Sequence, residues 1–575
     1  MRKIILILVV CILYLNSFGQ INREEYTFLA EEIPAETTTI HTNTNLLLAG
    51  EFLYYNVACL IKDKQTYSTI SKIAYVELVG ANETVIFKNK IKTDNSSAHG
   101  DFFIPTTIKT GHYKLISYTN WSKNNLTDSF GEVDLFIINP YSTEAQAVDD
   151  SEVQQNISKI IKADTLQLTK KQSISNNQLI LNKSNFGKRE KVSIEIEKGT
   201  LKKSNINSLS VRKVDFISTT HPDIQKTFQE DKASTYYLPE LRGEIISGRL
   251  ESTSDLKLGN ITVYLSFPGE NNIFKSTTTN TNGKFYFIVN ENYNYAIINL
   301  QIEDKQDENF KIILDNKSFS HYNHLHFTDL KLEPNIKDWL EKESIFHQIE
   351  NAYFSVKTDS ILPVKSNISF YQPLETTFEL DDYTRFKTVK ETFTEIVKTA
   401  YISNKGSEHF FKVPDLININ FNLDLNYLDP IILVDGLRIL DNEMILNYSA
   451  YNIKNIQTVT GQYVYQSNIY NGIISFETLK NDFRLENKAD FVRNIEFKNA
   501  LLNKMYFQPD YSKDNNLIRI PDYRVQLLWI PDLKRNDEKK IDFYTSDVTG
   551  YYEVVLKSIL PTGETEVKTT TFQVN

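Results

Sequence analysis

Short runs of aromatic and β-branched residues, each ended by Gly, Asn, Asp or Pro, recur along most of the 575-residue chain. Three such runs near the N-terminus are residues 49–55, 74–79 and 111–121. Tyr and Phe are abundant whereas Met and Trp are scarce, which favours strands over helices. Short strands separated by turn residues are typical of antiparallel β-sandwiches. We therefore predict a mainly β chain of tandem Ig-like sandwiches, with roughly three to five domains of about 100–200 residues each.

Residues 430–479 form a different pattern. An apolar run at 431–434 predicts a buried strand, and Asp435-Gly436 predicts a tight turn, because both residues tolerate positive φ. Residues 453–459 predict a second strand, and we expect Asn471-Gly472 to open a third at 473–479. Together these elements predict a small α/β domain.

This stretch resembles the core of a TonB-dependent receptor plug domain. The resemblance is carried by Val434-Asp435-Gly436, by the isoleucines of 453–459, and by Asn471-Gly472 followed by Thr478. A receptor barrel has about 22 strands of about 9–11 residues each, which requires several hundred residues. Only about 100 residues follow residue 479. We therefore expect a plug-like domain without a barrel, which serves recognition and not passage.

Residues from about 25 to 142 resemble the second macroglobulin-type (MG2-type) domain of α2-macroglobulin relatives. The motifs are "GE.L.Y" at 50–55, "YVEL" at 75–78 and "G.Y.L..YT.W" at 111–121. They are core strands and turns, so the resemblance implies a macroglobulin-like sandwich and no chemistry. Macroglobulins that trap proteases carry a Cys-Gly-Glu-Gln thioester, and its absence from this sequence excludes covalent trapping.

Two further resemblances cover the middle and the end of the chain. Residues 241–287 are similar to a carboxypeptidase regulatory-like domain, a seven-stranded Ig-like sandwich in which Asn282-Gly283 would form a hairpin turn. "RIPDYR" at 519–524 and "FYTSD..G.Y" at 543–552 resemble the C-terminal domain of exported envelope proteins that combine macroglobulin-like and plug-like modules. Neither resemblance implies catalysis.

These patterns divide the chain along its sequence. We expect a signal peptide at 1–19, a macroglobulin-like β-sandwich at 22–142, a linker and second small β domain at 143–235, a carboxypeptidase regulatory-like Ig-like sandwich at 238–333, a helical connector at 334–375, a plug-like α/β domain at 376–482 and a C-terminal β-sandwich at 486–575.

The N-terminus has the pattern of an export signal. A basic start, an apolar run at 4–15 and small residues at Ser17 and Gly19 predict cleavage before Gln20. The apolar run is too short to span a membrane, so we expect no transmembrane segment in the mature chain. We expect the protein in the cell envelope, either associated with the outer membrane or periplasmic. Of the two cysteines only Cys59 would remain, and its apolar setting predicts a buried small side chain.

Two groups of residues are candidates for a functional site. His321, His324 and His326 are the densest histidine cluster, and the last two would share a strand face, but exposed strand and loop histidines are the favoured interpretation. Asp381, Asp382, Glu391 and Glu395 are the carboxylates that could be considered for acid–base catalysis, and helix capping by Asp382 or Thr388 with surface charge is favoured instead.

Residues 334–353 predict an amphipathic helix that packs on a neighbouring domain. Its apolar positions would be Trp339, Ile345, Phe346, Ile349 and Phe354.

The sequence carries no known catalytic motif and has a net charge of −10, which argues against an enzyme and against a nucleic-acid-binding surface. We therefore predict no catalytic, cofactor-binding or metal-binding residues and no cofactor. The leading hypothesis is a non-enzymatic envelope binding or scaffold protein that docks to an outer-membrane protein or transporter through the plug-like domain. The alternative is an accessory subunit of a TonB-dependent outer-membrane transport system.

Overall fold

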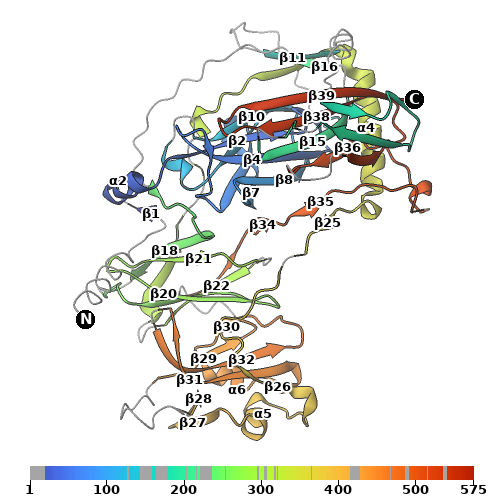
Figure 1. The fold of residues 1–575 in the computed structure, drawn as a ribbon. Helices are drawn as coiled ribbons and strands as arrows, with labels where there is room; N and C mark the ends of the chain where they lie inside the picture. Colours follow the sequence, from blue (N-terminus) through green and yellow to red (C-terminus); the bar gives the residue numbers. More distant parts are fainter. Residues whose placement is uncertain are drawn as a thin grey trace. The chain divides into compact units, whose positions relative to one another are not determined.

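The computed structural model describes a mainly β chain (Figure 1). The described residues are 20–21, 23–125, 129–142, 158–163, 178–197, 199–201, 204–214, 217–219, 236–252, 254, 256–293, 297–303, 307–315, 319, 322–363, 365–414, 428–466, 468–485, 491–514, 516–534 and 540–575. The expected signal peptide at 1–19 and the expected position His321 lie outside them. Within these residues no helix has the length and apolar character that crossing a membrane requires.

The chain forms two compact units, and each is discontinuous in sequence. The first, here called the sandwich–α/β unit, comprises Met1–Ile21, Arg242–Lys317 and Val364–Ala500. The second, here called the two-sandwich unit, comprises Asn22–Leu241, Ser318–Pro363 and Leu501–Asn575.

The two-sandwich unit begins with the first sandwich, whose two sheets enclose a core that includes Leu53, Tyr55, Val76 and Leu115. Alternate residues of each strand point into this core, as the sequence pattern predicts. One sheet contains β2 (Glu36–Thr42), β4 (Phe52–Ile61), β5 (Thr66–Tyr67) and β8 (Ser97–Phe103). The other contains β3 (Leu46–Leu48), β10 (Gly131–Ile138), β9 (Gly111–Tyr118), β6 (Ile73–Gly80) and β7 (Thr84–Lys92) in that order.

The second sandwich combines two segments that lie more than 300 residues apart in sequence. The sequence predicted two separate domains at 143–235 and 486–575, and this division is wrong, because strands from both segments share both sheets and one core. Neither segment alone has enough strands to cover its apolar face. One sheet has the order β12 (Leu179–Leu181), β14 (Lys191–Ile196), β37 (Lys540–Tyr544). The other has the order β13 (Asn185–Phe186), β39 (Thr565–Val574), β38 (Gly550–Ile559), β15 (Ile206–Lys213), β36 (Gln526–Ile530).

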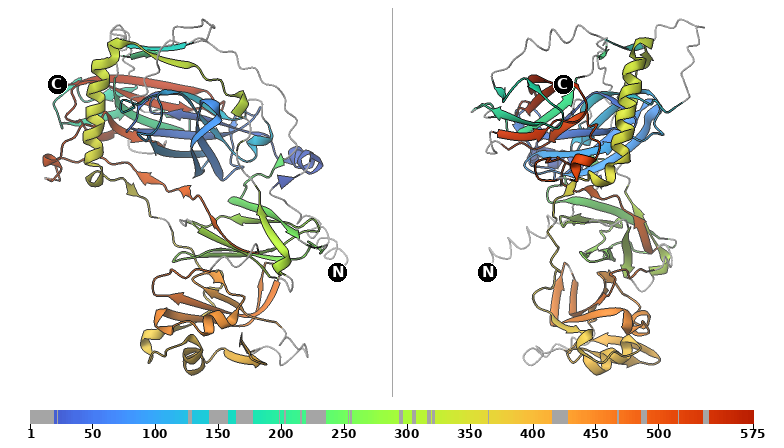
Figure 2. Two further views of the ribbon diagram at one scale, coloured as in Figure 1. Left: turned by 180° about the vertical axis from the view of Figure 1, so that it is seen from behind. Right: turned by 90° about the vertical axis from the view of Figure 1, so that its right-hand side faces the viewer.

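A strap between residues 319 and 356 crosses the first sandwich. Phe319 and Leu325 pack against Tyr75 and Tyr118 on the outer face of its larger sheet, and β24 (Asp329–Leu332) follows. The strap ends in α4 (Lys337–Ala352), which lies along both sandwiches of this unit (Figure 2). Smaller elements of the strap and of this unit are η4 (Tyr322–His324), η5 (Pro334–Ile336), η6 (Phe354–Val356), α2 (Arg23–Glu32), η1 (Ala81–Glu83), η2 (Ser122–Asn124), β11 (Ser158–Ala163), β16 (Ile217–Thr219), β17 (Tyr236–Tyr237), β25 (Ser360–Ile361), β35 (Lys504–Met505) and η9 (Leu517–Arg519).

Helix α4 forms where the sequence predicts it, but it buries a different face. Glu343, Ser344 and His347 are buried, whereas Ile345 is 53% exposed and Phe354, just beyond the helix, is 48% exposed. The expectation that Ile345 and Phe354 belong to a buried apolar face is wrong. The burial of Glu343 and His347 is offset by their contacts with Lys213 and Glu51 of the two sandwiches. Hydrophobic periodicity cannot reveal such partners.

In the sandwich–α/β unit, the third sandwich has seven strands, of which the seventh comes from the far end of the unit. β33 (Val492–Glu496) pairs with β22 and completes a sheet, so the α/β domain is inserted between the sixth and seventh strands. The expected range 238–333 therefore lacks one strand. One sheet has the strand order β21 (Lys284–Val289), β18 (Glu244–Ser252), β23 (Phe310–Leu314). The other has the order β20 (Ile273–Thr278), β19 (Thr262–Phe267), β22 (Ile297–Glu303), β33.

The Asn282-Gly283 turn forms, with Gly283 at φ +73°, but it joins β20 to β21, which belong to different sheets. It is a connection between sheets and not the hairpin turn that the sequence suggested.

The α/β domain has a five-stranded sheet with two helices on one face. Its order is β26 (Thr376–Glu379), β31 (Ile453–Tyr465), β32 (Asn468–Thr478), β29 (Ile431–Val434), β30 (Leu437–Arg438), and the other elements are α5 (Val389–Ile396), α6 (Asn442–Leu446), β27 (Tyr401–Lys405), β28 (Glu408–Lys412), η7 (Leu380–Asp382) and η8 (Ala450–Asn452). The remaining short elements of the chain are β1 (Gln20–Ile21), η3 (Asp307–Asn309) and β34 (Ala500–Leu501).

The turn at Asp435-Gly436 is confirmed, with φ of +49° and +82° at the two residues. The Asp435 carboxylate is buried and accepts hydrogen bonds from the Thr478 amide (2.7 Å), the Thr478 hydroxyl (2.6 Å) and the Phe483 amide (3.1 Å). It therefore fixes the end of β32 against the turn, which is a structural role.

Asn471-Gly472 does not open a strand. Both residues lie inside β32, and Gly472 has φ +90° where the register against β31 shifts between Val459 and Gln462. Gly472 lies opposite a bulge at Thr460-Gly461 of β31, so one long hairpin continues through this point, and a Gly occupies position 472 because its φ is left-handed. The hairpin turns near Gln466, about five residues before the expected position.

Both faces of this sheet are covered. Ile432, Ile474 and Phe476 point to the helices, and the alternating residues Ile431 and Ile473 point to the third sandwich. The second contact includes the aromatic side chains Tyr264, Phe274, Tyr371 and Tyr470. The α/β domain is thus fixed to its own sandwich through one sheet face. The fold class predicted from the sequence, β-sandwiches with a small α/β domain, is confirmed.

Candidate functional site

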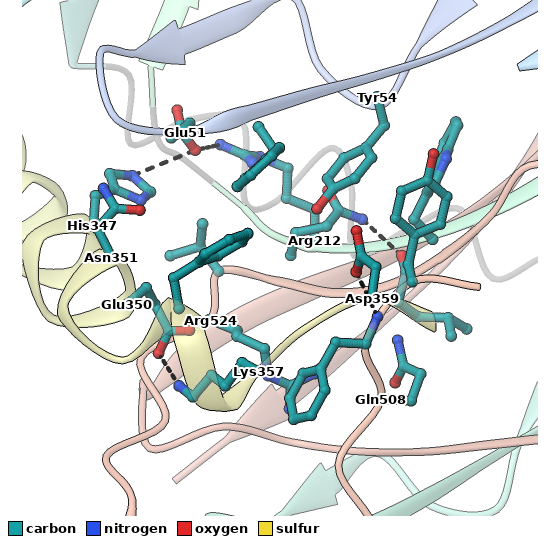
Figure 3. Close-up of a pocket in the computed structure, with 18 of the residues that line it drawn as sticks. Glu51, Tyr54, Arg212, His347, Glu350, Asn351, Lys357, Asp359, Gln508 and Arg524 are labelled. Atoms are coloured by element: carbon teal, nitrogen blue, oxygen red, sulfur yellow. Dashed lines mark hydrogen bonds and ion pairs between the residues drawn. The ribbon is translucent and has the colours of Figure 1, made fainter. Parts of the chain in front are cut away.

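A recess of about 130 Å³ lies in the two-sandwich unit, between its sandwiches and the end of α4 (Figure 3). Four segments form its walls. They are the start of β4, the end of α4 with the turn after it, the stretch after β35, and β36. The lining residues are Gly50, Glu51, Phe52, Tyr54, Arg212, His347, Glu350, Asn351, Phe354, Lys357, Asp359, Tyr506, Phe507, Gln508, Arg524, Val525, Gln526, Leu528 and Trp529.

Aromatic rings form a continuous wall of the recess. Phe52 and Tyr54 lie two residues apart on β4 and therefore share a face. Phe354 stacks on Phe52 with 5.7 Å between ring centroids, and Trp529 stacks on Tyr54 at 5.9 Å. Tyr506 meets Tyr54 edge to face at 4.9 Å. Because Phe354 is 48% exposed and Trp529 is buried, the wall runs from the surface to the interior.

Glu51 joins three parts of the unit at one edge of the recess. Its carboxylate accepts the Leu48 amide (2.6 Å), pairs with Arg212 of β15 (2.9 Å) and lies 3.3 Å from His347 of α4. Burial alone would raise the pKa of Glu51, but Arg212 and His347 outweigh it and hold the pKa below its ordinary value. Figure 3 shows the side chains of Arg212 and His347 converging on this carboxylate.

At the opposite edge, Lys357 attaches the end of the strap to the loop before β36. Its ammonium group pairs with Glu350 (2.6 Å), donates to the Pro521 carbonyl (2.7 Å) and lies 3.8 Å from Asp522. Glu350 also accepts the Tyr523 amide at 2.5 Å. Burial raises the pKa of Glu350, and nearby Asp522 adds to the effect.

The "RIPDYR" motif forms this loop. Asp522 makes a bidentate ion pair with Arg524, with both distances 2.8 Å, and accepts the Tyr511 hydroxyl at 2.5 Å. Burial opposes the charge of Asp522, yet Arg524 lowers its pKa to about 2. Arg189 makes a second bidentate pair with Asp547, with distances of 2.7 and 2.6 Å. The ion pair within this motif therefore fixes the loop that forms one wall of the recess.

A third ion group closes the remaining wall. The Lys504 ammonium lies 2.9 Å from Asp101 of β8 and 2.8 Å from Asp359. The Tyr506 hydroxyl donates to Asp101 at 3.0 Å, and the Phe507 amide donates to Asp359 at 2.9 Å. These contacts hold the aromatic wall in one position.

The lining combines aromatic rings with paired charges. The lining residues include no Ser, Thr or Cys that could act as a nucleophile, and the carboxylates Glu51, Glu350 and Asp359 each hold a cation. Across the described residues, no three His, Cys, Asp or Glu side chains gather closely enough to hold a metal ion.

Among the described residues, the candidate histidines and carboxylates named from the sequence do not line this recess. His324, which is half-buried, ends the short turn η4, and the exposed His326 follows it in irregular backbone. This agrees with the favoured interpretation of loop histidines, and the strand face of the metal-binding alternative does not form.

Thr388 and Glu391 form a capping box on α5, as the capping interpretation predicts. Asp381 pairs with Arg385 at 2.6 Å. Cys59 is fully buried, and burial followed by the nearby Glu36 raises the pKa of its thiol, which agrees with the prediction of a small buried side chain.

Sequence reasoning missed the recess because its walls come from segments up to about 480 residues apart. The local signal was the Phe52–Tyr54 pair, two aromatic residues on one face of a strand.

Comparison with solved structures returns chains of bacterial α2-macroglobulin. Escherichia coli α2-macroglobulin activated by porcine elastase has 8% identity and a TM-score of 0.22, covering 94% of this chain and 44% of that chain. Salmonella α2-macroglobulin reacted with methylamine has 8% identity and a TM-score of 0.15, covering 94% of this chain and 23% of that chain. Dimeric latent PorU from Porphyromonas gingivalis has 7% identity and a TM-score of 0.16, covering 52% and 34%.

The present chain thus spans less than half the length of the chains that it matches. TM-scores this low carry no argument about family or activity. No family model matches the sequence, and no curated protein matches it.

Proposed function

We propose that the chain is a non-enzymatic binding and scaffold protein of the cell envelope that holds a polypeptide partner at the aromatic recess. The observation that carries this proposal is the aromatic wall, which leads from the exposed Phe354 to the buried Trp529. Binding hot spots are typically aromatic residues beside a desolvated pocket.

The size of the recess supports a polypeptide ligand. Pockets for drug-sized ligands and cofactors are typically about 300–1,000 Å³, whereas this recess has about 130 Å³. It accommodates one large side chain and little more. A partner would therefore insert a single aromatic or branched aliphatic residue, while its backbone remained at the surface.

The charge arrangement supports an apolar anchor. Arg212, Lys357 and Arg524 all hold carboxylate partners, so a charged ligand group would have to compete with an existing ion pair. These pairs also fix the walls before binding. A preformed recess costs less ordering entropy on association than one that must form around its ligand.

The envelope location in this proposal is supported by the signal-like pattern at 1–19 and by the resemblances to macroglobulin-like, carboxypeptidase regulatory-like and plug-like modules. Cell fractionation with crosslinking tests it. The protein should be recovered with an outer-membrane partner. Recovery in the cytosol would refute it.

Selection from a displayed peptide library against the full chain tests the recess itself. Enriched peptides should share one large apolar residue, and Phe354→Ala should weaken their binding about tenfold or more. Ile345→Ala is the matched control, because Ile345 lies on α4 of the same strap, is 53% exposed and does not line the recess. Equal binding by the two variants would refute the proposal.

A second candidate is docking through the α/β domain, as an outer-membrane anchor or as an accessory subunit of TonB-dependent transport. The observation that favours it is the end of the β31–β32 hairpin, where the cross-strand neighbours Val464 and Ile469 are 69% and 53% exposed. Val464→Asp should then reduce membrane recovery of the chain while Phe354→Ala leaves it unchanged. The reverse result favours the recess.

A further inference from the structure

A second cavity of about 360 Å³, with fewer charged lining residues, lies in the two-sandwich unit, on the outer face of the larger sheet of the second sandwich. It is distinct in character from the recess, although Trp529 lines both. Its lining residues are Thr42, Asn43, Thr44, Asn45, Ser208, Ser210, Trp529, Glu553, Val555, Lys557, Val567 and Thr569.

The strand register explains the floor of this cavity. Ser210 of β15 lies opposite Trp529 of β36 and Val555 of β38, and Val555 lies opposite Thr569 of β39. Directly opposed residues share a face of the sheet. Four strands therefore present an indole, a hydroxyl, an apolar side chain and a second hydroxyl in one row. With strands about 4.8 Å apart, the row is about 14 Å long.

A second row runs beside the first. Ser208 lies opposite Lys557, and Lys557 lies opposite Val567, which is 52% exposed. The floor thus alternates hydroxyl groups with the apolar side chains Val555 and Val567. One lysine and one glutamate, Glu553, are the charged residues of the lining, and their charges cancel.

The roof is the loop at 42–45 between β2 and β3 of the first sandwich. The Lys557 ammonium donates to the Thr42 carbonyl at 2.7 Å, and Asn43 donates to Gln526 at 3.0 Å, so the loop is tied to the floor at two points. The Asn45 side-chain oxygen accepts the Thr42 hydroxyl at 3.1 Å.

Several hydrogen-bonding groups of the lining retain capacity. The Ser210 hydroxyl accepts from Gln526 at 2.9 Å and keeps its own proton to donate. The Thr569 hydroxyl makes no hydrogen bond within the part of the chain that the structure describes. In the same part of the chain, the buried indole N–H of Trp529 has no acceptor. This N–H is enclosed by protein atoms and is not open to the cavity.

We propose that this cavity binds a neutral oligosaccharide of about two sugar rings. Uncharged hydroxyl and amide side chains match the hydroxyl groups of a sugar, and the valines between them match its C–H faces. Balanced charge gives no preference for an acidic ligand. The volume falls within the usual range for small-ligand sites. This inference goes beyond the proposed polypeptide binding and does not depend on it.

Titration of the full chain with cellobiose, maltose and N,N′-diacetylchitobiose, followed by saturation-transfer NMR, tests the proposal. At least one disaccharide should bind saturably. Thr569→Val should weaken that binding about three- to tenfold, which corresponds to one lost hydrogen bond. Thr571→Val is the matched control, since Thr571 lies on the same strand and the same face but outside the cavity. It should bind like the wild type.

Valine suits a strand position, so both variants should fold, and far-ultraviolet circular dichroism checks this. Absence of saturable binding by all three sugars would overturn the proposal. So would equal loss in the two variants, or binding confined to a galacturonate dimer, which would assign the cavity to acidic ligands through Lys557.

Discussion

Replacing Glu51 by Gln is expected to destabilise the two-sandwich unit, because the Glu51 carboxylate contacts Leu48, Arg212 and His347 at the edge of the recess. Gln has the same shape and can still accept the Leu48 amide. It cannot compensate the charge of Arg212, whose side chain is only 13% exposed. The variant therefore isolates the charge of Glu51 from its packing.

The expected loss in unfolding free energy is about 3 kcal/mol. Removing one partner of a fully buried ion pair costs about 3–5 kcal/mol. The lower end applies here, because the Arg212 side chain retains 13% exposure and the Glu51 side chain 4%. His347 lies on the same carboxylate and adds to the loss when it is protonated.

Intrinsic tryptophan fluorescence during urea denaturation measures this loss. The chain has three tryptophans, Trp121, Trp339 and Trp529, and all of them lie in the two-sandwich unit. The signal therefore reports the unfolding of that unit. Asp542→Asn is the control, because the pair of Asp542 with Lys191 lies in the same unit, is about half exposed and should contribute less than about 1 kcal/mol.

The pH dependence supplies a second check on the same variant. The folded pKa of Glu51 is lowered, so its contribution is present above the ordinary value of 4.5 and is lost as pH falls through the folded pKa. The difference between wild type and Glu51→Gln should therefore be largest near pH 7 and should shrink below pH 4.5. A Glu51→Gln variant within 0.5 kcal/mol of wild type at pH 7, by the roughly 0.5 kcal/mol scale of neutral surface changes, would refute the reasoning.

Three further predictions concern other parts of the chain. Asp435→Asn should cost about 2 kcal/mol and speed hydrogen exchange at the Thr478 amide, which loses its charged acceptor. Gly472→Ala should destabilise the α/β domain more than Gly406→Ala in calorimetry. Both have positive φ, but only at Gly472 would the Cβ lie 2.6 Å from a backbone oxygen. Burial, with Lys557, lowers the pKa of His41 to about 3, so the two-sandwich unit should lose up to about 1.4 kcal/mol per pH unit below pH 6.5, and His41→Gln should reduce that slope.

Local features of the fold were predictable because they depend on neighbours in the sequence. The strand at 431–434 and the turn at Asp435-Gly436 follow from an apolar run and two residues that tolerate positive φ. The capping box at Thr388 and Glu391 follows from their spacing. Each of these elements is decided within a few residues.

The errors arose where distant partners decide the outcome. Asn471-Gly472 has the composition of a turn, yet pairing with β31 continues past it, with Gly472 opposite a bulge in β31. Helix α4 buries Glu343 because Lys213 of the second sandwich pairs with it. No pattern within residues 334–353 could show that partner.

The division of the chain failed for the same reason. Strands β33, β36 and β38 complete sandwiches begun hundreds of residues earlier, and the sequence pattern of a strand does not name its neighbour. The recess was missed for the same reason, because its walls come from segments that are distant in sequence. Phe52, Phe354 and Trp529 become adjacent only after both halves of the unit have assembled.

Photocrosslinking in intact cells tests the central claim, that the recess holds a polypeptide partner, most directly. A photoreactive phenylalanine is placed at position 354, at the mouth of the recess, and separately at position 345, which is equally exposed on the same strap. We predict one adduct of defined mass from position 354 and none of that mass from position 345. The same adducts from both positions, or none from either, would contradict the account.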